Sequence, residues 1–80
     1  MARPQGTIRP IAADETTNLV HRGIFDFASE EVAEDTLRAN GYEVQEDNLY
    51  RRDQEPAFMA IGFATEHEGR QVWRVNVGQA

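Results

Sequence analysis

The alternation of hydrophobic and polar residues is clearest in the last third of the chain, where it predicts two long strands. Residues 57–65 read AFMAIGFAT and form the most hydrophobic run in the sequence. In an extended chain one side of this run carries Met59, Ile61 and Phe63, and the other carries Phe58, Ala60, Gly62 and Ala64. A strand with two apolar sides fits the middle of a sheet, so we expect residues 57–65 to form the central strand. After a turn at residues 66–69, residues 70–77 alternate Trp73, Val75 and Val77 with Val72, Arg74 and Asn76, and predict the last strand.

A helical pattern with two clear ends covers residues 29–40, SEEVAEDTLRAN. Ser29 fits the N-cap, because its hydroxyl can accept a hydrogen bond from a free amide of the first turn, and two glutamates follow where the helix dipole favours anions. Asn40-Gly41 fits a Schellman ending, in which Tyr42 packs on Leu37. The spacing places Val32, Ala33, Thr36 and Leu37 on one side, and Glu31, Glu34, Asp35 and Arg38 on the solvent side.

Shorter patterns predict the remaining elements. Residues 42–52 alternate on both sides of Asp47-Asn48, which is typical of a hairpin. Residues 19–27, LVHRGIFDF, predict a strand in which Gly23 marks a bulge or a close backbone approach. Residues 7–11, TIRPI, predict a short edge strand, since Pro10 cannot donate to a ladder, and residues 1–6 are expected to be frayed.

The order of these elements predicts the fold class. Strands with short connections dominate, so we expect an α+β fold: a mainly antiparallel sheet of about four to six strands with one helix packed on a face. Eighty residues make a single domain, 1–80, with a small core and no deep active site. There is no cysteine, so disulfides and thiolate metal sites are excluded. No signal peptide or membrane-spanning run is recognisable, which favours the cytoplasm and no membrane partner.

The negative charge of the chain is concentrated in its middle. The net charge is -6, but residues 26–55 hold ten acidic residues against three arginines, a local balance of -7. Negative charge repels phosphates, so we expect no direct binding of nucleic acid. A contrary hypothesis uses four arginines beside two aromatics, namely Arg51, Arg52, Arg70 and Arg74 with Tyr50 and Trp73. Cross-strand pairing of these arginines with Glu43, Glu46 and Asp47 is the favoured interpretation.

The residues that catalysis needs are scarce. The single serine, Ser29, is explained by capping, and His21 and His67 are the two imidazoles. His67, between Glu66 and Glu68, offers metal-ligand chemistry, but adjacent residues point apart and a solvated turn is the favoured interpretation. No phosphate-binding glycine motif or calcium loop is present. We therefore expect a protein that is not an enzyme and that has no cofactor and no metal.

The acidic cluster is the main candidate for function. Acids at i and i+3 or i+4 on a helix stand about 5–6 Å apart, near the spacing of phosphates along a nucleic acid, so such a row fits a groove built for DNA. A solvated helix face also explains the helical acids, but not those beyond the helix. The candidate partner-binding residues are Glu31, Glu34, Asp35, Glu43, Glu46 and Asp47. The expected partner is a basic nucleic-acid-binding protein or complex.

The segment FDFASEEVAEDTLRANGYEV, residues 25–44, together with the size, acidity and absence of cysteine, resembles the small phage and mobile-element proteins known as anti-CRISPRs. That resemblance implies a stoichiometric inhibitor, here one that occupies the DNA-binding groove of a type I CRISPR surveillance complex. The alternative is a structural or adaptor module of a phage or mobile-element assembly, which acts through edge-strand or dimer contacts. Its signature would be an apolar patch exposed at residues 7–11 or 70–77. Whether the chain is a monomer or a homodimer stays open in both hypotheses.

Overall fold

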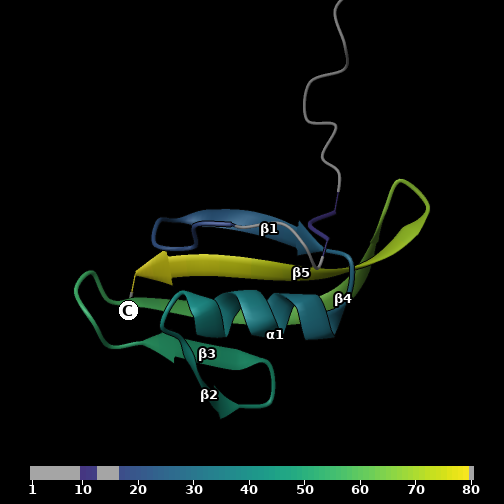
Figure 1. The fold of residues 1–80 in the computed structure, drawn as a ribbon. Coiled ribbons are helices and arrows are strands. Elements are labelled where there is room, and N and C mark those ends of the chain that lie inside the picture. Colours follow the sequence, from purple (N-terminus) through teal and green to yellow (C-terminus); the bar gives the residue numbers. More distant parts are fainter. Residues whose placement is uncertain (1–9, 13–16, 80) are drawn as a thin grey trace, which may run out of the picture.

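The computed structural model describes residues 10–12 and 17–79 of the chain. Its elements are β1 (Gly23–Phe27), α1 (Glu30–Ala39), β2 (Glu43–Glu46), β3 (Leu49–Arg52), β4 (Phe58–His67) and β5 (Arg70–Gln79) (Figure 1). The five strands form one sheet in the order β1-β5-β4-β3-β2, with every neighbouring pair antiparallel. This confirms the predicted α+β class and places β4 at the centre, as its composition predicts.

Two hairpins build most of the sheet. β4 and β5 pair along their whole length, and the two-residue turn between them consists of Glu68 and Gly69, both with positive φ. Such a turn follows the right-handed twist of the paired strands. The β2–β3 hairpin turns at Asp47-Asn48, where Asn48 has a φ of 66°, and its register is irregular near Val44. β5 lies between β1 and β4, so the prediction that residues 70–77 offer an exposed edge is wrong.

Both predicted ends of α1 are confirmed. The Val32 amide donates to the Ser29 hydroxyl at 3.2 Å. At the other end Gly41 has a φ of 90°, the Gly41 amide donates to the Arg38 carbonyl, and the Tyr42 amide donates to the Leu37 carbonyl. These two hydrogen bonds define a Schellman ending, which stops the helix where the chain turns back into β2.

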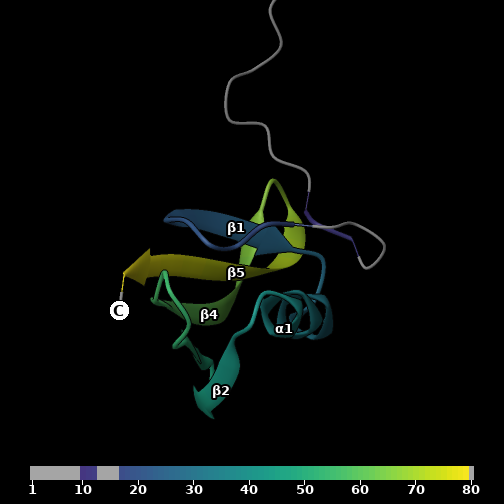
Figure 2. The ribbon, with the colours of Figure 1, turned by 60° about the vertical axis from the view of Figure 1, so that its left-hand side comes forward.

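The core lies between α1 and one face of the sheet (Figure 2). The helix contributes Ala33 and Leu37, and the sheet contributes Phe27, Tyr50, Phe58, Ala60, Val75 and Val77. Trp73 packs against this cluster and covers Gly62 of the neighbouring strand. Because side chains alternate along a strand, these residues fix which face of each strand is turned toward α1.

The predicted strand at residues 19–27 begins only at Gly23, because the preceding backbone bonds elsewhere. The Leu19 amide donates to the side chain of Asn40 at 3.2 Å, and the Tyr42 hydroxyl donates to the Leu19 carbonyl at 2.7 Å. These bonds hold the fully buried Leu19 in the core at the end of the helix. Gly23 is paired in regular register rather than in a bulge, and the ring of Phe25 lies against it.

Most of the predicted edge strand at residues 7–11, and all of the predicted frayed end at residues 1–6, lie outside the described residues. Within them, Ile11 forms a single parallel bridge with Phe27. The Ile11 amide donates to the Asp26 carbonyl and the Ala28 amide donates to the Ile11 carbonyl, both at 2.9 Å. The chain therefore lies against the outer edge of β1 at this point.

Candidate interaction surface

The structure divides the six predicted partner-binding acids between two sides of the sheet. On α1, Glu31 and Asp35 are exposed, while Glu34 is half-buried and lies 3.6 Å from Arg38. Burial of the Tyr50 phenol raises its pKa, and the charge of Glu34 is a smaller cause of the same shift. Of these three helical acids, two are therefore exposed, and the third is partly neutralised by Arg38 of the same helix.

The acids of the β2–β3 hairpin lie on the other side. Glu43 is in register with Arg51, which is in register with Met59. The next row of the sheet contains Tyr50 and Ala60, and both of these residues pack in the core under α1. Strand alternation therefore turns Glu43 away from the helix. Glu46 and Asp47 follow at the exposed turn. One flat partner surface cannot contact all six acids at once.

Three of the arginines that the sequence predicts to pair with these acids have other partners in the structure. Arg51 donates to Asp53 at 2.6 Å. The guanidinium of Arg52 donates to the Asn40 carbonyl at 2.8 Å and to the Gln54 carbonyl at 2.9 Å, so it connects the end of α1 to the β3–β4 loop. Arg74 pairs with Asp26. The predicted pairing with Glu43, Glu46 and Asp47 is therefore wrong for these three arginines, and the acids stay solvated.

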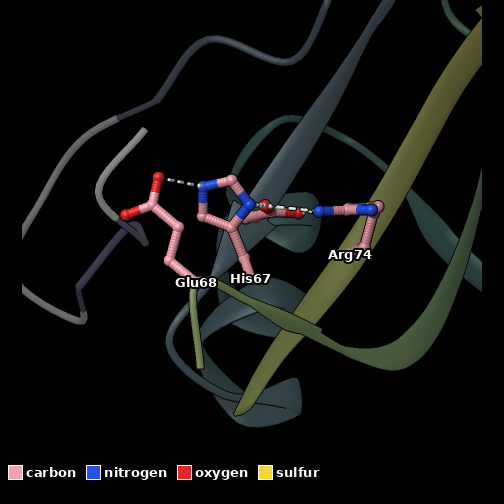
Figure 3. Close-up of polar contacts among 4 residues, drawn as sticks. His67, Glu68 and Arg74 are labelled. Atoms are coloured by element: carbon pink, nitrogen blue, oxygen red, sulfur yellow. Dashed lines mark hydrogen bonds and ion pairs between the residues drawn. The ribbon is translucent and has the colours of Figure 1, made fainter. Parts of the chain in front are cut away.

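Asp26 and Arg74 form a polar cluster on β1 and β5 (Figure 3). The guanidinium donates twice, from Nε to Oδ1 at 2.7 Å and from Nη2 to Oδ2 at 3.0 Å. Asp26 is 4% exposed and is the buried charged residue of the described chain. The hydrogen bonds from Arg74 lower the pKa of the Asp26 carboxyl despite its burial, with a smaller contribution from His67. The carboxylate is therefore held ionised.

His67 lies beside this pair rather than in a solvated turn, which corrects the sequence interpretation. It belongs to the end of β4, and its Nδ1 lies 3.9 Å from Asp26 Oδ2, while its Nε2 lies 3.5 Å from Glu68 Oε2. Nε2 is buried and, in the described part of the chain, makes no hydrogen bond of good geometry. Sequence reasoning missed this cluster, although an aspartate inside the apolar run GIFDF was a signal for it.

The chemistry of the cluster is structural. Both oxygens of Asp26 accept from Arg74, and the 3.9 Å between His67 Nδ1 and Asp26 Oδ2 is too long for a hydrogen bond between carboxylate and imidazole. Residues 10–12 and 17–79 contain no group of three His, Asp or Glu side chains that could hold a metal ion. What the cluster does is join β1 to β5 and bring the end of β4 against them.

A small hollow lies at the start of α1. It has a volume of about 180 Å³ and is lined by Ser29, Glu30, Gln71 and Trp73, among others. Ligand pockets typically measure about 300–1,000 Å³ and enclose most of the ligand. This hollow is smaller than that range and open to solvent.

The face of the sheet opposite α1 is the most distinctive surface of the molecule. We call it the open face and define its apolar residues as Ile24, Leu49, Met59, Ile61 and Phe63. Ile24 is 64% exposed, Ile61 53% and Phe63 39%. In Figure 2 α1 lies along one side of the sheet, and no second layer of the described chain covers the other side.

The register brings four of these residues into one patch. Leu49 of β3 lies opposite Ile61 of β4, whereas Ile24 of β1 is separated from Ile61 by Asn76 of β5. Met59 and Phe63 precede and follow Ile61 on the same side of β4. A contiguous apolar patch of this kind on a small protein marks a contact surface. The two apolar sides of residues 57–65 predicted the central strand, but not that one of its sides would be exposed.

In the described residues no helix has the length or hydrophobicity needed to cross a bilayer, and α1 has only ten residues. Comparison of the chain with known proteins found no matching family model, no matching curated protein and no matching solved structure.

Proposed function

We propose that this chain is a binding protein without catalytic activity, and that its open face is the surface by which it acts as a structural or adaptor module. The observation that supports this proposal is the exposure of Ile24, Ile61 and Phe63 on one uncovered face. Exposed apolar surface has a free-energy cost of about 25 cal/mol per Å², which is recovered when a partner covers it. The polar cluster and the small hollow offer no comparable chemistry.

A photo-crosslinking phenylalanine analogue at position 63 tests the proposal. It preserves an aromatic ring at a side chain that is 39% exposed, so the fold is expected to be retained. The same analogue at position 35, on the exposed side of α1, is the control. We expect crosslinked protein from position 63 in the host cell and little from position 35. Crosslinks from position 35 alone would assign function to the helix instead.

The exposed acids of α1 support a second candidate function. In this proposal the chain is an anti-CRISPR inhibitor that places an acidic helix in the DNA-binding groove of a type I CRISPR surveillance complex. Glu31 and Asp35 stand one helical turn apart and both face solvent, so they can follow a row of phosphate-binding residues. Because Glu43, Glu46 and Asp47 lie toward the other side of the sheet, α1 would make the central contact and the hairpin its edge.

Charge reversal of the helix tests this second function. The double variant Glu31→Arg and Asp35→Arg should lose the ability to prevent DNA binding by a purified surveillance complex, measured by electrophoretic mobility. The double variant Glu55→Arg and Glu66→Arg is the matched control, since it makes the same change in charge at two exposed residues outside the helix. Inhibition by the unmodified chain should also weaken with added salt. No inhibition at any salt concentration would rule this function out.

A further inference from the structure

We infer that the partner of the open face is a second copy of this chain, in a two-fold dimer that stacks the two sheets face to face and leaves both α1 helices outside. This inference rests on the proposed contact role of the open face and names its occupant. Packed sheets lie about 10 Å apart with their strands within about 30° of each other, and their facing side chains interdigitate. The register of the sheet shows which side chains would meet.

A two-fold axis that lies between β4 and β5, parallel to both, gives a complementary contact. It places β4 of one copy over β5 of the other, and β1 over β3. Met59 then faces Gly78 of the second copy, so that a large side chain lies opposite a residue without one. Ile24 faces Leu49 of the second copy, and both are apolar.

The arrangement meets two polar residues of β5. Asn76 is the register partner of Ile61 and faces Ile61 of the second copy, and Arg74 is the register partner of Phe63 and faces Phe63 of the second copy. The Arg74 side chain is 28% exposed and its hydrogen-bonding edge is occupied by Asp26, which leaves the flat side of the guanidinium for an aromatic ring. Guanidinium groups stack favourably on aromatic faces. No unpaired charge needs to be buried at this point.

The acids of β2 lie outside the overlap. The axis maps β2 beyond β1 of the second copy, so Glu43 and Glu46 stay in solvent instead of facing each other. What opposes association is the overall charge of -6 on each copy. Salt screens this repulsion without weakening apolar contacts, so the dimer should become tighter as salt is added. A contact between acids and a basic groove has the opposite dependence on salt.

The size of the face predicts a weak dimer. Four strands spaced about 4.8 Å apart, over about five residues of about 3.3 Å, cover about 300 Å² per copy. Two copies together then bury about 600 Å², which is below the roughly 1,200 Å² of the smaller stable interfaces. The dimer should therefore be weak and dissociate reversibly in the high micromolar to millimolar range.

Sedimentation equilibrium of the purified chain, from micromolar to millimolar concentration and at low and high salt, tests the inference. We expect a monomer–dimer equilibrium that shifts toward the dimer with salt. Ile61→Glu should weaken association at least about tenfold, as loss of a central contact residue does. Val44→Glu is the matched control: Val44 is 44% exposed and in register with Tyr50, so it adds the same charge on the helix side.

A second variant protects the test against misfolding of Ile61→Glu. Asn76 is already polar and exposed in the centre of the open face, so Asn76→Arg should keep the fold, by circular dichroism, and lose the dimer. A monomer at every concentration, or equal association by Ile61→Glu, Asn76→Arg and Val44→Glu, would overturn the inference. If the chain is monomeric while position 63 crosslinks to another protein, the dimer is refuted and the binding function stands. If the chain is monomeric and position 63 also gives no crosslink, both the dimer and the binding function are refuted.

Discussion

Replacement of Gly62 by alanine is a sensitive probe of the packing between α1 and the sheet. Gly62 lies on β4 under the indole ring of Trp73, which packs against the core from β5. A Cβ atom at Gly62 would stand 2.9 Å from Cε2 and 3.2 Å from Cζ2 of that ring, and closer still to Nε1. Ordinary van der Waals contact begins at 3.4 Å. The ring must therefore move away from its packed position.

Two opposing effects set the magnitude. Over-packing of this kind costs about 1–3 kcal/mol. Alanine in a strand is better than glycine by about 0.5–1 kcal/mol, because it loses less conformational entropy on folding. The net loss of unfolding free energy for Gly62→Ala should be about 1–2 kcal/mol. In a domain of this size that lowers the Tm by roughly 5–15 °C.

Thermal and urea unfolding, followed by circular dichroism and by fluorescence, measures this loss. Trp73 is the one tryptophan in the chain, so its emission in the folded state reports directly on the displaced ring. Gly78→Ala is the matched control: it makes the same substitution on the adjacent strand, where a Cβ would meet nothing within 4 Å. That variant should be as stable as the unmodified chain or slightly more stable.

A double-mutant cycle identifies the cause. In a Trp73→Leu background the ring that clashes is absent, so Gly62→Ala should cost nothing further. Equal stability of Gly62→Ala and Gly78→Ala, with unchanged tryptophan emission, would refute the proposed packing of Trp73 on Gly62. A loss of stability that persists at full size in the Trp73→Leu background would refute the ring as its cause.

Two further predictions concern buried polar groups. Tyr42→Phe removes the 2.7 Å hydrogen bond to the Leu19 carbonyl and should lower the unfolding free energy by about 1 kcal/mol. Tyr50→Phe, at an equally buried residue, is the control and should lower it less. Equal losses of stability in urea unfolding would contradict this prediction. Arg74 holds the pKa of Asp26 below its ordinary value of 3.8, so this carboxylate stabilises the fold above that pH and the stabilisation is lost as pH falls through the lower, folded-state pKa. Asp26→Asn should therefore be less stable than the unmodified chain at neutral pH, and the two unfolding free energies should converge on acidification. A difference between them that does not change with pH would exclude Asp26 as its source.

Local chemistry made the helix predictable. The Ser29 hydroxyl, the Asn40-Gly41 pair and Tyr42 act within a few residues of the helix ends, and each occupies the position that its side chain and backbone preference favour. The hairpin turn at Asp47-Asn48 was predictable for the same reason, since asparagine tolerates a positive φ. Structure that depends on near neighbours is encoded in short stretches of sequence.

The candidate sites depended on contacts between distant residues. Asp26 and Arg74 are 48 residues apart, and only the pairing of β1 with β5 brings them together. The start of β1 was misjudged because Leu19 bonds to Asn40 and Tyr42, more than 20 residues away. A hydrophobic pattern does not carry such information, because it describes one strand at a time.

By itself the sequence determined the fold class, the helix and its ends, the central place of residues 57–65, and the net charge of -6. The tertiary structure alone decided which apolar side of β4 is buried. One helix can cover one face of a five-stranded sheet, so Phe58 and Ala60 enter the core while Ile61 and Phe63 stay exposed. The same packing separated the acids of α1 from those of β2, because side chains on successive strand residues point to opposite faces of the sheet.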